Sequence, residues 1–118
     1  MDKRYRLRSN QDFKKVYRNG KYYWNRNLVL YLSKNDLGHT RVGITVTKKI
    51  GKSVVRNKVK RRIREIIRKN FHNIKEEYDI ILVPKKNVVD IDFKTLESAV
   101  IHILKISGIL KNTGENNG

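Results

Sequence analysis

The chain has 118 residues, of which 28 are lysine or arginine and 11 are aspartate or glutamate, for a net charge of +17. This length makes one modest domain over residues 1–118, and the charge predicts a polyanionic partner, because uncompensated repulsion disfavours a compact state. The absence of cysteine excludes disulfides and thiolate metal sites. No apolar run suits a membrane span or a signal peptide, so we expect a cytoplasmic protein without membrane contact. Residues 1–8 are predicted to form a basic arm that is mobile until it meets its partner, and residues 111–118 a frayed tail.

A capping-box pattern predicts the first helix, because Ser9 is followed three residues later by Asp12. Phe13, Val16 and Tyr17 then fall at the i, i+3, i+4 spacing of one helix face. Aromatic residues at this spacing belong more often to a core than to a ligand platform. The residues alone therefore favour a packing role for Phe13 and Tyr17.

Three later segments have the composition of strands. Residues 21–33 are rich in aromatic and branched side chains, and residues 25–27 divide them into two short strands. Residues 41–47 alternate strictly between apolar and polar side chains. We predict that these segments form an antiparallel hairpin with one polar face. Residues 78–83 are a nearly continuous apolar strand, which Pro84 ends.

The densest charge lies at residues 48–69, where eleven basic residues accompany a single acid, Glu65. The basic residues are Lys48, Lys49, Lys52, Arg56, Lys58, Lys60, Arg61, Arg62, Arg64, Arg68 and Lys69. Apolar residues interrupt this run at helical spacing, which predicts a helix with one stripe docked on a core. The stripe consists of Val55, Val59, Ile63, Ile66 and Ile67.

The opposite face of this helix is polar and basic. It carries Asn57, Arg61, Arg64 and Arg68, which advance by four, three and four residues. Ser53 is the expected N-cap, and Gly51 permits a tight turn or a close approach to a phosphate. A basic face is often merely solvated. Here the density of charge and the lack of acidic partners at i±4 favour nucleic acid.

A last helix is predicted with Asp90 or Asp92 as its cap and Gly108 at its end. Its buried stripe is Phe93, Leu96, Val100, Ile103 and Leu104. The element order is therefore helix, two or three strands, basic helix, strand and helix, which is typical of a small two-layer α+β sandwich. A crossover between parallel strands through the basic helix is right-handed in about 98% of known cases.

The sequence contains no pattern of a protein active site. The three histidines are scattered, and none has a second ligand at metal-site spacing. A protein nuclease usually needs two or three carboxylates around its metal ions. Glu76, Glu77 and Asp79 are the only acidic cluster, and charge balance or end-capping is the favoured role for them. We expect a protein that binds, while a partner carries out any chemistry.

The stretch KKIGKSVVRNKVKRRIRE closely resembles the signature of the bacterial ribonuclease P protein component. Its most specific features are the order Lys-Lys-Ile-Gly, Val-Arg-Asn and Lys-Arg-x-Ile-Arg. The resemblance extends from about Arg6 to Gly108. Lys58 stands where the family usually has arginine, which keeps the charge but loses the planar, bidentate fork. Tyr17 stands where the family often has phenylalanine, so stacking survives and a hydroxyl is added.

This resemblance implies a ribonucleoprotein of tRNA processing, an endoribonuclease whose catalytic RNA subunit removes the 5′ leader of precursor tRNA. The RNA subunit would hold the required Mg²⁺, and the protein would have no catalytic residue, metal or cofactor of its own. The implied fold is a mixed sheet of about four strands with three helices, similar to the second domain of ribosomal protein S5. Its crossover at the basic helix would be left-handed, against the general rule.

The resemblance also assigns residues to two RNA surfaces. The basic helix and the loop before it would bind the RNA subunit through Lys48, Lys49, Lys52, Arg56, Asn57, Lys58, Lys60, Arg61 and Arg64, and Arg68 is added from its place on the helix face. A cleft between the first helix and the sheet would bind the leader through Phe13, Tyr17, Tyr31 and Thr45. Aromatic rings stack on any base, which suits a leader of variable sequence. The resemblance thus reverses the preference for a core at the first two of these residues.

Two rival interpretations follow from the same composition. A ribosomal or other structural RNA-binding protein is equally small and basic, and an affinity specific for precursor tRNA would separate the two. A DNA-binding protein could place the basic helix in a major groove. A strand precedes that helix instead of a short turn and a partner helix, so we expect no DNA partner.

Overall fold

The computed structural model describes residues 2–111, so most of the predicted C-terminal tail lies outside the described residues. The described chain forms α1 (Asn10–Asn19), β1 (Lys21–Trp24), β2 (Leu28–Lys34), β3 (Arg41–Ile44), α2 (Ser53–Asn70), β4 (Tyr78–Pro84) and α3 (Phe93–Ile106). Short 3-10 turns lie at Lys3–Tyr5, Lys48–Ile50, Phe71–Asn73 and Lys86–Asp90. None of the helices in this part of the chain has the length and apolar character that crossing a membrane requires.

The four strands form one mixed sheet in the order β1-β2-β4-β3. β1 pairs with β2 and β2 with β4 in antiparallel fashion, whereas β3 and β4 are parallel and joined through α2. The predicted division of residues 21–33 into two strands is confirmed, and residues 25–27 form the turn between them.

The predicted hairpin between residues 21–33 and residues 41–47 is wrong, because β2 and β3 are not neighbours. The physical reason lies in β4, whose residues 79–82 are all buried. A strand that is buried on both faces belongs in the middle of a sheet. β4 therefore separates β2 from β3, and the hairpin is the one between β1 and β2.

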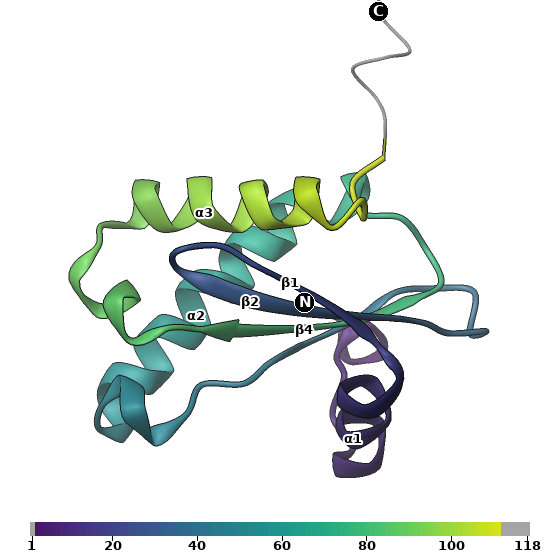
Figure 1. Cartoon of the computed structure of the whole chain (residues 1–118), viewed down its shortest axis with the longest axis horizontal. Coiled ribbons are helices and arrows are strands. Elements are labelled where there is room, and N and C mark those ends of the chain that lie inside the picture. The colour runs from purple at the N-terminus through teal and green to yellow at the C-terminus, as the bar shows by residue number, and fades with distance from the viewer. Residues whose placement is uncertain (1, 112–118) are drawn as a thin grey trace, which may run out of the picture.

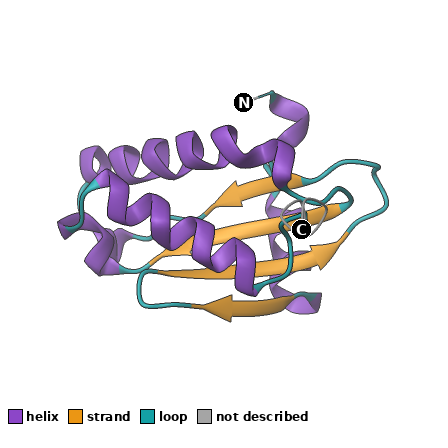
Figure 2. Ribbon diagram, turned by 90° about the horizontal axis from the view of Figure 1, so that it is seen from above, coloured by secondary structure: helices purple, strands orange, loops and turns teal. Residues whose placement is uncertain are grey.

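The main core lies between the sheet and the helices α2 and α3, which cover one of its faces side by side (Figure 2). The predicted stripe of α2 is confirmed: Val59, Ile63, Ile66 and Ile67 are buried, and Val55 packs against the core. Burying one such side chain contributes about 1.5–3 kcal/mol to stability. The expected cap is wrong, because α2 begins at Ser53 itself and the capping position belongs to Lys52, whose side chain accepts no hydrogen bond.

The last helix, α3, follows its prediction closely. Asp92 is the cap, and its Oδ1 accepts a hydrogen bond from the Thr95 N–H at 2.8 Å. The Thr95 side chain and this N–H bond together hold the pKa of the Asp92 carboxyl below its ordinary value. Gly108 follows the helix with φ of 77°, a left-handed conformation that glycine adopts without strain.

α1 lies on the other face of the sheet, opposite α3 (Figure 1). A second, smaller cluster of buried residues holds it there: Leu7, Val16 and Ile81. Phe13, Tyr31 and Val83 pack against this cluster and are only partly buried.

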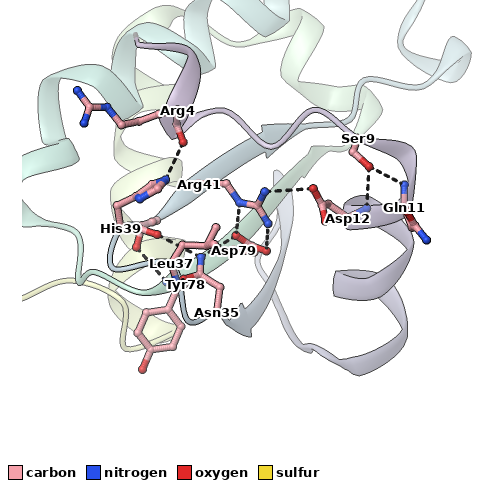
Figure 3. A network of polar contacts seen from close by, with 11 residues as sticks. Arg4, Ser9, Gln11, Asp12, Asn35, Leu37, His39, Arg41, Tyr78 and Asp79 are labelled. Carbon is pink, nitrogen blue, oxygen red and sulfur yellow. Dashed lines mark hydrogen bonds and ion pairs between the residues drawn. The ribbon is translucent and has the colours of Figure 1, made fainter.

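A charged network also ties α1 to the sheet (Figure 3). The Arg41 guanidinium donates from Nε and Nη2 to both oxygens of Asp79, at 2.9 and 2.8 Å, and from Nη1 to Asp12 Oδ2 at 3.1 Å. Asn35 Nδ2 donates to Asp79 as well, at 2.8 Å. The charge-balancing role expected for Asp79 is confirmed, and its partner joins β3, β4 and the first turn of α1.

The N-terminal segment differs from the expected free arm. Leu7 is buried, and its N–H donates to the Val42 carbonyl at 3.0 Å, so the segment follows β3. Arg6 makes a parallel bridge to Val42, and the Tyr5 ring lies 5.0 Å from the Phe71 ring. Residues 5–7 are therefore docked on the rest of the protein, although the N-terminal segment as a whole, residues 1–8, has four basic residues.

Candidate nucleic-acid interface

The polar face of α2 forms a shallow, basic surface. One hollow of about 450 Å³ is lined by Val54, Asn57, Lys60, Arg61 and Arg64. The predicted shared face is therefore confirmed for Asn57, Arg61 and Arg64, whereas Arg68, the fourth residue predicted for it, does not line this hollow. Because one turn of a helix has about 3.6 residues, steps of three and four residues bring side chains to the same face.

The turn before α2 brings further cations to the same end. Lys48, Lys49 and Lys52 are all exposed, and Ile50 between them is buried and anchors the turn. Gly51 has φ of 147°, and a Cβ at this position would lie 3.3 Å from the Val55 Cβ. The backbone therefore requires glycine where the chain enters the helix.

The predicted RNA-binding cations differ in how free their charge is. In the described part of the chain, no carboxylate pairs with Lys58, Lys60 or Arg61. Arg68 instead donates to both oxygens of Glu65, at 2.9 and 2.7 Å, and holds the pKa of that carboxyl below its ordinary value. Arg68 is therefore less available to bind a phosphate than these three cations.

The basic face continues into a second hollow of about 270 Å³ at the junction of α2, β3 and the N-terminal segment, called here the junction cavity. Its lining includes Arg6, Arg8, Lys60 and Arg64 together with the Phe13 side chain. Burial and the nearby charge of Arg6 lower the pKa of the Arg64 guanidinium. A bound anion reduces the electrostatic repulsion between cations that are crowded in this way.

One cation of the junction cavity has an unsatisfied donor. The Nε of Arg6 is buried and has no hydrogen-bond partner among residues 2–111. A buried donor without a partner costs about 1–3 kcal/mol. Sequence reasoning missed Arg6 and Arg8, because the segment was expected to be free, and the bridge to β3 is a tertiary feature.

The four residues predicted for the leader cleft do come together. The Tyr17 hydroxyl is 2.9 Å from Thr45 Oγ1, and the Tyr17 and Tyr31 rings meet edge to face at 4.7 Å. The Phe13 and Tyr17 rings lie 6.5 Å apart. Phe13 rests on Gly43, where a Cβ would lie 2.5 Å from Phe13 Cζ. Only glycine at this position lets the ring settle on the sheet.

Burial divides the helix face that the sequence left ambiguous. Val16 is 1% exposed and belongs to the small core, whereas Tyr17 is 38% exposed. Phe13 is half-buried and packs at the edge of the same core. The helix thus places one residue in the core and leaves two aromatic rings partly or largely accessible to solvent.

Two further aromatic residues, Tyr22 and Trp24, lie on the same side of the sheet and were not predicted as site residues. The sequence signal was present, because two residues two positions apart in a strand point to the same face. Without the order of the strands, however, that face could not be placed next to the cleft.

The titratable groups of residues 2–111 show no arrangement for metal binding. Within residues 2–111, no group of three or more histidine, aspartate or glutamate side chains is placed to hold a metal ion. The structure thus combines a basic helix, a cationic cavity and a group of neighbouring aromatic rings. Proteins that bind single-stranded RNA combine cations, which contact the backbone, with aromatic rings, which contact the bases.

Comparisons with known proteins identify the family. A family model described as Ribonuclease P matches residues 1–107. A ribonuclease P protein component of Finegoldia magna is 48% identical over 107 residues, which cover 89% of this chain and 92% of that protein. The chain therefore belongs to the ribonuclease P protein family, and its role lies in tRNA processing rather than among structural RNA-binding proteins.

Solved structures agree with this assignment. The RNase P protein of Staphylococcus aureus has a TM-score of 0.85 and 35% identity, with 91% of this chain and 98% of that chain covered. The RNase P protein of Thermotoga maritima has a TM-score of 0.79 and 36% identity, with coverages of 85% and 94%. The predicted α+β fold, with three helices and a mixed sheet of four strands, is confirmed.

Proposed function

We propose that this chain is the protein subunit of a ribonuclease P in which the RNA subunit cleaves the precursor tRNA. The basic face of α2 and the turn before it bind the RNA subunit. The cleft between α1 and the sheet binds the single-stranded 5′ leader. The protein contributes binding energy and alignment, and its place of action is the cytoplasm, where bacterial precursor tRNA is made.

The observation that carries this proposal is the junction cavity. Phe13 from α1 and Gly43 from β3 line it together with Lys60 and Arg64 from α2. A strand of RNA that stacks on the cleft aromatics therefore meets the basic helix without leaving the surface. Unpaired cations beside stacking rings suit the alternation of phosphate and base in single-stranded RNA.

The chemistry of cleavage is assigned to the RNA subunit and the Mg²⁺ that it holds. The protein supplies a concentrated positive charge, with a net value of +17. Such charge neutralises phosphates that would otherwise need additional metal ions. We expect the requirement for the protein to be strongest at low magnesium and weaker at high magnesium.

The test is cleavage of a precursor tRNA by the matching RNA subunit with and without this protein, over a range of magnesium concentrations. The expected result is a large increase in cleavage at low magnesium and no cleavage by the protein alone. Cleavage by RNA-free, nuclease-free protein at any magnesium concentration would overturn the proposal. So would an equal affinity of the holoenzyme for precursor and mature tRNA.

A further inference from the structure

The edge strand β1 carries two large aromatic side chains that the described chain leaves open to solvent. Tyr22 is 60% and Trp24 is 62% exposed. Tyr23 between them points the other way and packs against the main core. The strand thus divides its aromatic residues between the two faces of the sheet, and nothing in residues 2–111 covers the outer pair.

These two rings continue the row of aromatic side chains in the cleft. Tyr22 is directly opposite Tyr31 in the β1–β2 register, and their ring centroids are 5.9 Å apart. The Trp24 ring follows at 5.8 Å from Tyr22. Beginning with Phe13 and Tyr17, five rings therefore form one series from α1 to the outer edge of the sheet.

The charge around this row favours a polyanion as its occupant. From Phe13 to Lys34, with both ends included, the sequence has six basic residues and no acidic one. Lys21, at the start of β1, and Arg26, in the turn after β1, are both exposed. A second copy of the chain would bring a charge of +17 toward another of +17, whereas a single strand of RNA brings phosphates and bases together.

We propose that Tyr22 and Trp24 extend the leader platform past Tyr31 and stack about two additional bases of single-stranded RNA, farther from the cleavage site. This inference rests on the proposed leader cleft. The number of contacts between protein and leader then depends on leader length. Short leaders occupy the cleft between α1 and the sheet, and longer leaders also contact β1.

The first experiment uses the fact that Trp24 is the only tryptophan of the chain. The holoenzyme is titrated with precursor tRNAs that carry a short leader of a few nucleotides or a long one of roughly ten, while tryptophan emission is followed. The expected result is a change in emission with the long leader and little change with the short leader. Equal emission changes for the two substrates would overturn the inference.

The second experiment measures affinity with the same two substrates for Tyr22→Ala and Trp24→Ala. Each variant should bind the long-leader substrate about five-fold or more weakly, because one stacked base contributes about 1–3 kcal/mol. Binding of the short-leader substrate should not change. Tyr22→Phe should retain the affinity. Ile106→Ala, at a side chain 46% exposed on the helix α3 across the sheet, is the matched control and should have no effect.

Phe13→Ala, measured in parallel, separates the two proposals. If it weakens leader binding while Tyr22→Ala and Trp24→Ala do not, the extension is wrong and the cleft stands. If the unmodified holoenzyme shows no preference for any leader, the proposed function itself fails. Sedimentation tests the rival occupant: a dimer that Trp24→Ala converts to monomer, without loss of leader affinity, would assign the rings to a second copy and overturn the inference.

Discussion

The replacement of Phe13 by alanine distinguishes an RNA cleft from a buried core. The ring is half-buried, packs against the small cluster that contains Leu7, Val16 and Ile81, and lies on Gly43. Loss of a fully buried phenylalanine costs about 3–5 kcal/mol, so this partly exposed ring should cost about 2 kcal/mol. A domain with a stability of about 5–15 kcal/mol remains folded after such a loss.

The assay is paired: thermal unfolding of the Phe13→Ala protein, and affinity of the holoenzyme for precursor and mature tRNA. One lost stacking contact should weaken precursor binding by about 1–3 kcal/mol. Mature tRNA has no leader, so its binding should not change. Val16→Ala is the matched control, because this residue is 1% exposed in the same cluster and should lower stability without a leader-specific effect.

Two results would refute the reasoning about Phe13. Loss of the cooperative melting transition would show that the ring is a core residue, because an accessible side chain does not contribute most of the stability of a domain. An equal loss of affinity for precursor and mature tRNA would show that the ring supports the protein as a whole rather than the leader.

Further perturbations test the other parts of the site. Gly43→Ala should weaken leader binding without removing any aromatic ring, since its Cβ would lie 2.5 Å from the phenylalanine ring above it; unchanged precursor affinity would contradict this. Arg61→Ala and Arg64→Ala should each reduce the salt dependence of binding to the RNA subunit by roughly 0.7–0.9 in slope, whereas Arg68→Ala should change it less because of its ion pair. A large fall in melting temperature with an unchanged salt slope would show that Arg61 and Arg64 stabilise the fold instead of binding phosphates. Arg41→Ala should lower stability by about 3–5 kcal/mol, because it leaves a buried carboxylate unpaired; a denaturant midpoint close to that of the unmodified protein would contradict it.

The helices could be predicted well from the sequence, because the residues that determine a helix and its ends lie close together in the chain. The apolar stripe of α2, the aspartate cap of α3 and the glycine after α3 each depend on residues within a few positions of one another. The order of the strands is not local information. Adjacent strands with a turn between them favour a hairpin, and only the continuous burial of β4 shows that it must separate β2 from β3.

The candidate site shows the same division between local and tertiary information. Helical spacing placed Phe13 and Tyr17 on one face, but the same spacing suits a core and a cleft, and only the family resemblance favoured the cleft. Leu7 was missed because one apolar residue among arginines gives no periodicity. Its burial depends on a backbone bridge to β3 that no pattern within the segment could indicate.

The main core aligns the two proposed RNA surfaces, although it lies on neither of them. Ile63 and Ile67 fix α2 against the sheet. Arg61 then points toward the exposed basic hollow, and Lys60 and Arg64 reach both this hollow and the junction cavity. Successive residues of a helix differ by about 100° around its axis, so a shift of the apolar stripe by one residue would turn these cations away from the cleft. The spacing of apolar residues in the basic stretch therefore sets the orientation of the basic face of α2 relative to the junction cavity, and so relative to the leader path proposed above.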